Sequence, residues 1–209
     1  MLSEILSAFN IKTRSSQLRE LAEEMNIPYT RKTPFKNLPK AVRRFKIFRN
    51  KSSRRIRNVL SFQENDLPGQ FKLFDFLHQN SSEERRRTTI LLFRSDALNL
   101  PSFRVRPKNA LHILGEIFVQ PNIVFEGHPG FMEKYTVSGD NSEEIKYALK
   151  PEAIDFLTHK KNWNLEGFGP FLIIYRKGKR PRVNEILPFY RQGAQVCRWM
   201  LFSNTNDFV

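Results

Sequence analysis

Near the start of the chain, apolar residues recur at the spacing of an α-helix. Leu18, Leu21, Ala22 and Met25 stand at positions i, i+3, i+4 and i+7, so they fall on one stripe of a helix. Ser16 has the short hydroxyl side chain that commonly caps a helix N-terminus. The pattern therefore predicts a short amphipathic helix over residues 16–26.

A second apolar stripe lies in a strongly basic stretch. Val42 and Phe45 follow Leu38 at steps of four and three residues, and Pro39 suits a first helical position. We predict a short basic amphipathic helix over residues 39–49. The interpretation that we favour packs its apolar stripe on the core. The alternatives are a helix on an anionic membrane and a helix in a nucleic-acid groove.

From residue 58 onward the apolar positions change to the period of two that is typical of strands. Turn residues at 66–69 and 167–170 separate neighbouring runs, which predicts two β-hairpins. The predicted strands are 59–62, 71–77, 88–93, 102–106, 123–125, 135–137, 163–165 and 171–175.

Helical spacing returns between and after these strands. We predict helices over 109–119, 141–149 and 151–159, and a final helix over 183–202 in which Pro188 causes a kink or a restart. The fold class is therefore α+β, a mainly antiparallel sheet with N-terminal, inserted and C-terminal helices. We divide the chain into a basic helical N-terminal segment, an α+β body and a flexible tail. These are residues 1–57, 58–202 and 203–209, with the first segment packed on the body or projecting from it.

Charge is distributed very unevenly along the chain. The net charge is +14, and the window 31–57 contains twelve cations and no acidic residue, so the remainder carries only +2. Twelve like charges repel one another, which favours an anionic partner over a merely solvated surface. A smaller basic cluster spans 176–182, and strand alternation places two further arginines on one face of strand 102–106. The partner-binding residues that we predict are Arg31, Lys32, Lys36, Lys40, Arg43, Arg44, Lys46, Arg49, Lys51, Arg54, Arg55, Arg57, Arg104, Arg106, Lys177, Lys179 and Arg180.

The sequence offers little for catalysis. Glu126 and His128 would share a face of an extended strand, where they could bind a metal or share a proton together with Asp75. Gly127 and Pro129 favour a turn instead, and no nucleotide, hydrolase or zinc motif is present. We therefore expect neither a catalytic residue, nor a metal, nor a cofactor, nor a small-molecule substrate.

Cysteine and hydrophobic content point to an intracellular protein. Cys197 is the only cysteine, and it lies in a helical apolar run where a buried structural thiol is expected. Apolar runs are far shorter than the roughly 20 residues that span a bilayer, and no export signal is visible. We expect a cytoplasmic protein, with peripheral attachment to the inner face of a membrane as an option.

Several short stretches together resemble a family of uncharacterised bacterial proteins. They are Asn58-Val59-Leu60, Leu73-Phe74-Asp75-Phe76, Phe103-Arg104-Val105-Arg106-Pro107, Phe125-Glu126-Gly127-His128-Pro129 with Phe131 and Tyr135, and Trp163-Asn164-Leu165-Glu166-Gly167 with Leu172 and Tyr175-Arg176. The resemblance implies a shared fold and work close to a membrane, because relatives often carry an N-terminal membrane anchor. The present sequence departs from them in lacking one. No activity or catalytic residue follows from the resemblance.

Two functional hypotheses follow. The first is a non-catalytic adaptor that docks the 31–57 segment on an acidic protein complex or an anionic membrane surface, with Phe35, Phe45, Ile47 and Phe48 adding apolar contact. The alternative is a protein that binds RNA or DNA through the same residues. A shared face of the 31–57 arginines with Arg104, Arg106 and Lys179 would favour nucleic acid, whereas a projecting arm would favour protein or membrane.

Overall fold

The computed structural model describes residues 12–49, 51, 53–79, 85–108 and 122–201. Its strands form one antiparallel sheet in the order β1-β2-β3-β4-β8-β7-β5-β6. The strands are β1 (Tyr29–Thr33), β2 (Ser53–Glu64), β3 (Leu67–Gln79), β4 (Arg85–Arg94), β5 (Leu100–Pro107), β6 (Tyr135–Gly139), β7 (Asn164–Gly169) and β8 (Phe171–Tyr175). The described helices are α2 (Arg14–Glu24), α3 (Pro129–Lys134), α4 (Ser142–Ala148), α5 (Pro151–His159) and α6 (Ile186–Leu201). The predicted α+β class is confirmed.

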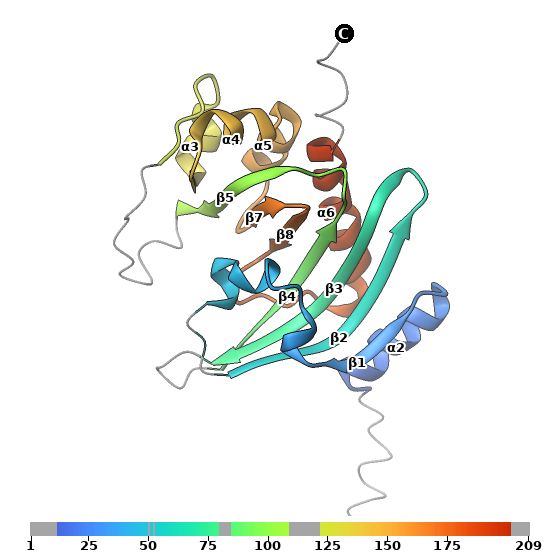
Figure 1. Ribbon diagram of the computed structural model, residues 1–209. Helices are drawn as coiled ribbons and strands as arrows, with labels where there is room; N and C mark the ends of the chain where they lie inside the picture. Colours follow the sequence, from blue (N-terminus) through green and yellow to red (C-terminus); the bar gives the residue numbers. More distant parts are fainter. Residues whose placement is uncertain (1–11, 50, 52, 80–84, 109–121, 202–209) are drawn as a thin grey trace, which may run out of the picture.

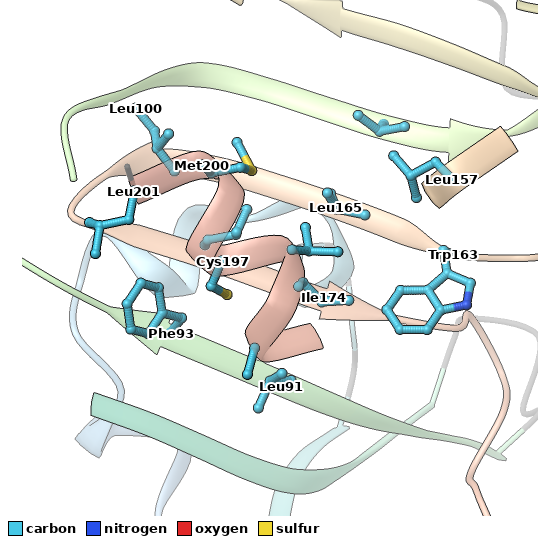
Figure 2. Close-up of a cluster of buried hydrophobic side chains, with 14 of the residues drawn as sticks. Leu91, Phe93, Leu100, Leu157, Trp163, Leu165, Ile174, Cys197, Met200 and Leu201 are labelled. Atoms are coloured by element: carbon cyan, nitrogen blue, oxygen red, sulfur yellow. The ribbon is translucent and has the colours of Figure 1, made fainter. Parts of the chain in front are cut away.

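One face of the sheet, which we call the helical face, is covered mainly by α6 and α2 (Figure 1). Leu91 of β4, Ile174 of β8 and Cys197 of α6 meet in its core (Figure 2). Helix and sheet approach closely at Gly193, where an added Cβ would collide with the side chain of Leu91. Cys197 is fully buried, as expected, and burial raises the pKa of its thiol.

The opposite face is covered by three short 3-10 turns, η1 (Phe35–Asn37), η2 (Val42–Arg44) and η3 (Lys46–Phe48), which we call the 3-10 cover (Figure 1). Val42 and Phe48 are completely buried against Phe74, Phe76 and Ile173 of the sheet. The segment therefore packs on the sheet, as its apolar stripe predicted, and the projecting-arm alternative is wrong.

The cover is not the single helix that was predicted over 39–49. Phe45 has extended backbone angles, φ −57° and ψ 145°, and separates η2 from η3. The backbone N–H groups of Lys46 and Ile47 donate to the buried carboxylate of Glu166 on β7. A side-chain acceptor thus replaces the carbonyl oxygens that a continuous helix would have supplied.

The expected division at residue 57 falls inside strand β2. Strand β1 pairs with β2 in the register Tyr29↔Leu60 and Lys32↔Arg57, so the basic window contributes two neighbouring strands to the common sheet. The connection over 28–34 had given no strand pattern, because residues 30–32 of this edge strand are all exposed. The predicted N-terminal segment, residues 1–57, and the predicted body, residues 58–202, therefore contribute strands to one common sheet.

Most of the remaining elements agree with the predictions in kind and differ at their ends. The strand predicted over 123–125 is absent, although the Ile123 backbone N–H donates to the Val137 carbonyl at 2.8 Å, and helix α3 was not predicted. Helix α2 is capped by Thr13, whose hydroxyl accepts from the Ser16 backbone N–H at 3.2 Å, and not by Ser16 itself. Helix α6 begins at Ile186, so Pro188 lies in its first turn and interrupts no internal hydrogen bond. Both predicted hairpins are present. The predicted helix over 109–119 and the tail 203–209 lie outside the described residues.

Candidate partner-docking surface

Basic residues from three separate stretches of sequence meet at one end of the sheet. This cationic sheet end consists of residues 53–57 of β2, 75–79 of β3, 85–89 of β4 and 176–180 after β8. It contains ten arginine and lysine residues and one acidic residue, Asp75. Figure 1 shows these ends of β2, β3 and β4 lying side by side.

Strand register places the cations opposite one another. Arg55 and Arg87 both pair with Leu77 of the strand between them. Because neighbouring strands lie about 4.8 Å apart, the two arginine backbones are about 10 Å apart, and both side chains are exposed. In the adjacent row, Arg54 and Arg86 flank His78 in the same way.

The chain that follows β8 adds the third group of cations. The Thr89 backbone N–H donates to the Lys179 carbonyl at 3.1 Å, and the Gly178 N–H donates to the Thr88 hydroxyl at 3.1 Å. These bonds hold the turn after β8 against the start of β4. Burial lowers the pKa of the Arg180 guanidinium; nearby Asp75 raises this pKa, whereas Arg14 and Arg87 lower it. The cations of this end are therefore close enough to influence one another.

Asp75 does not neutralise this surface, because its carboxylate is buried and fully engaged. Arg14 of α2 binds it through Nε at 2.8 Å and Nη2 at 3.1 Å. Asn58 Nδ2 and Thr89 Oγ1 donate to the same carboxylate at 2.9 Å and 2.7 Å. Arg14 thus forms the direct ion pair of this acid, and the exposed cations outnumber the charge that Asp75 can offset.

The 3-10 cover carries further exposed cations next to this end. Its Phe35 ring packs on Phe76, with ring centroids 6.1 Å apart, and the Arg54 guanidinium lies 4.9 Å from the same Phe35 ring. The cover therefore borders the cationic sheet end. The exposed basic side chains on and beside it are Arg31, Lys32, Lys36, Lys40, Arg44, Lys46 and Arg49, whereas Arg43, Lys51 and Arg57 are half-buried.

Two predictions about this surface need correction. Arg104 and Arg106 do share a face of β5, but Arg104 is half-buried beside Glu166 and Tyr175, and Arg106 is buried with its Nε bonded to Thr136 at 3.3 Å. Arg104 lies close enough to Glu166 to oppose the rise that burial causes in the pKa of that carboxyl, whereas Arg106 bonds to a neighbouring strand. They do not extend the exposed basic surface.

The aromatic residues of the basic window are also not available to a partner. Phe45, Ile47 and Phe48 are buried in the core of the cover face, and Phe35 is half-buried. Phe45, Ile47 and Phe48 therefore cannot provide the apolar contact that the sequence analysis assigned to them. Neither geometric condition for separating the two functional hypotheses is met in full, since Lys179 joins the basic surface while Arg104 and Arg106 do not.

Residues that the prediction missed belong to the same surface. Arg86 and Arg87 were not among the predicted partner-binding residues, and neither was Arg14, which binds the one acid of this surface. The signal was the hairpin between β3 and β4, whose register Leu77↔Arg87 places these arginines one strand away from the arginines of β2. This register could have been inferred from the sequence only if the end of β3 and the start of β4 had been known.

The residues that the sequence suggested for catalysis, Glu126, His128 and Asp75, do not form one site. Residues 126–127 form a turn, with Gly127 at φ +82°, and Glu126 is exposed, while Asp75 lies in the Arg14 cluster. The turn that was favoured at this position is confirmed. Among the described residues no group of three or more His, Cys, Asp or Glu could hold a metal ion. No helix in the described part of the chain is long and apolar enough to cross a membrane.

The fold and the surface together define an α+β protein with a cationic sheet end. No family model and no curated protein matches the sequence. A solved structure, the crystal structure of the mycobacterial trehalose monomycolate transport factor A, TtfA, is similar with a TM-score of 0.57 at 10% sequence identity. The likeness covers 91% of this chain and 94% of that chain. At this identity the likeness concerns the fold alone.

Proposed function

We propose that this protein is a non-catalytic accessory protein that docks its cationic sheet end on an acidic face of a protein assembly. The observation that carries the proposal is the convergence of three basic stretches at one end of the sheet, with their single acid already bound by Arg14. Fields of this kind steer association and select partners of opposite charge. The similar fold of TtfA, which is named as a transport factor, supports an accessory role and not a catalytic one.

An anionic membrane surface is the second place where the same end could dock. Clustered cations attract anionic headgroups by about 1 kcal/mol each near the surface. We favour a protein partner because the exposed large apolar side chains among the described residues are Met25, Val124, Tyr147 and Phe168, none of which lies within the cationic sheet end. Binding of nucleic acid is the alternative function. It is less favoured because the buried aromatic residues of the cover cannot stack on bases.

A charge-reversal variant tests this proposal. Arg55→Glu, Arg87→Glu and Lys179→Glu together change one exposed cation in each of the three basic stretches. The matched control carries Arg19→Glu, Lys72→Glu and Arg191→Glu, three exposed cations outside the cationic sheet end with the same total change in charge. Tagged proteins are used to recover partners from native lysate at low and high salt, with and without nuclease, and are also tested on anionic vesicles.

We expect a nuclease-resistant protein partner whose recovery falls by about tenfold or more with the charge-reversal variant and with added salt. The control variant should recover that partner as well as the wild-type protein does. Recovery that collapses with nuclease would replace the proposal with nucleic-acid binding, and binding to vesicles alone would replace it with membrane docking. Equal recovery by both folded variants would show that the cationic sheet end is not the docking surface.

A further inference from the structure

A hollow of about 350 Å³ lies between the end of α5 and the start of α6, beside the ends of β7 and β8. Lys160 and Lys161 border it from the chain after α5, Trp163 and Arg176 from the strand ends, and Phe189 from α6. Neither the docking proposal nor the sequence analysis gives this hollow a role. Its lining combines an aromatic wall with three cationic side chains.

Arg176 is the unusual member of this lining. Its guanidinium carbon lies 5.4 Å from the centroid of the Phe189 ring and 5.9 Å from that of Trp163. Ring faces attract the cation without accepting its N–H groups as strong hydrogen bonds. The Arg176 Nε is buried and has no hydrogen-bond partner in the described part of the chain. Because this nitrogen is closed off from solvent, a ligand in the hollow would meet the guanidinium through its terminal nitrogens.

The charge of the lining favours an anion. Three cations face a single acid, Glu185, and one oxygen of Glu185 already accepts the Arg182 backbone N–H at 2.7 Å. His159 at the rim has its Nδ1 2.9 Å from the Asp155 carbonyl oxygen, so this nitrogen is engaged within its own helix. The two lysines and Arg176 thus exceed the negative charge of the pocket by two.

We propose that this hollow is a binding pocket for a phosphate group. An excess of two positive charges matches a phosphate monoester dianion, whose oxygens can accept hydrogen bonds from guanidinium and ammonium groups of the kind that line the hollow. Trp163 is only 2% exposed, so its ring cannot stack on a base, and the pocket recognises the phosphate without an attached nucleobase. Arg176 belongs both to this hollow and to the cationic sheet end. The docking variant leaves Arg176, Lys160 and Lys161 unchanged, so either proposal can fail without the other.

The test uses the purified full chain and inorganic phosphate, with acetate and chloride as comparison anions at constant ionic strength. Titration calorimetry measures binding, and tryptophan fluorescence follows the site, since Trp163 lies against Arg176. We expect saturable binding of phosphate that is weakened about tenfold in Arg176→Gln, where a charged hydrogen-bond donor is lost. Lys161→Glu, at an exposed position, should weaken binding at least as much and is expected to fold normally.

Lys72→Glu is the matched control, because Lys72 is an exposed cation on strand β3 outside the pocket lining. Absence of saturable phosphate binding, or equal binding by Lys161→Glu and Lys72→Glu, would overturn the proposal. The source of the phosphate is then assigned with glycerol 3-phosphate in solution and with vesicles that contain phosphatidic acid. Whichever of the two binds more tightly, that binding must also be lost in Lys161→Glu.

Discussion

Two buried carboxylates, one on each face of the sheet, fasten the covering layers to the strands. On the helical face, Asp75 holds Arg14 of α2 through two hydrogen bonds. On the cover face, Glu166 accepts from the Tyr175 hydroxyl at 2.6 Å and from two backbone N–H groups of the 3-10 cover. Buried ionisable groups persist only when they are paired and hydrogen-bonded, and both carboxylates meet this condition.

Glu166 should give the stability of the protein a recognisable dependence on pH. Burial raises the pKa of its carboxyl above the ordinary value of 4.5, although Arg104 and the hydrogen bonds act in the opposite direction. Above pH 4.5 the unfolded chain releases this proton while the folded chain still holds it, so the free energy of unfolding falls as pH rises through the raised pKa. The contribution of the protonated carboxyl is fully present below pH 4.5.

The variant Glu166→Gln does not titrate and tests this dependence. We expect its deficit in the free energy of unfolding, relative to the wild-type protein, to be largest near pH 4.5 and to shrink as pH rises. Denaturant unfolding at a series of pH values measures it, with Glu133→Gln at an exposed position as the control. A deficit that grows with pH would mean that the folded protein lowers the pKa of Glu166.

At the scale of elements, the 3-10 cover is the least predictable part of the fold and a strongly packed one. Phe48 is completely buried, and its ring packs edge-on against Phe76 at 4.9 Å and Phe35 at 5.6 Å between centroids. The cover contributes to stability mainly through such aromatic burial, because each 3-10 turn is only three residues long.

Phe48→Ala should therefore lower the free energy of unfolding by about 3–5 kcal/mol, the usual cost of emptying a buried phenylalanine site. Phe168→Ala is the control, because Phe168 is 41% exposed at the hairpin between β7 and β8, and it should cost under about 1 kcal/mol. Chemical denaturation monitored by circular dichroism compares the two. A similarly small loss for Phe48→Ala would show that the cover adds little to the stability of the sheet.

Sequence patterns predicted the elements that depend on local information. The α2 stripe at Leu18, Leu21 and Ala22 and the apolar runs of β3 and β8 could be recognised from short-range patterns, and these elements are confirmed. The cover was mistaken for a helix because the acceptor of its N–H groups, Glu166, stands 120 residues away from Lys46 in the chain. The cationic sheet end was only partly predicted for the same reason, since it arises from strand register and not from any one basic run.

At the scale of the whole molecule, the basic window 31–57 is part of the sheet domain and is not a separate segment attached to it. It supplies strand β1, the start of β2 and the cover between them. Its loss would expose both the edge of the sheet and the apolar cover face. The cations of this window are therefore carried on a rigid surface, which lowers the entropy cost of docking compared with a flexible arm.

Hydrogen exchange measured by mass spectrometry tests this integration. Amides of residues 46–48 in the cover should be protected to an extent comparable with those of residues 88–93 in β4, because Lys46 and Ile47 donate to a buried carboxylate. Residues 30–32 of the exposed edge strand should exchange faster and serve as the internal comparison. Complete exchange of the cover within seconds, while β4 stays protected, would restore the picture of a separable basic segment.

The deep burial of Cys197 allows the partner-facing surface of this protein to be mapped by site-directed cysteine crosslinking. Cys197 is the only cysteine of the chain, it is fully buried, and its raised thiol pKa keeps it unreactive. A cysteine introduced on the surface would then be the sole target of a thiol-specific crosslinker. Lys179→Cys and Lys72→Cys, on and off the cationic sheet end, would report directly which side of the molecule faces its partner.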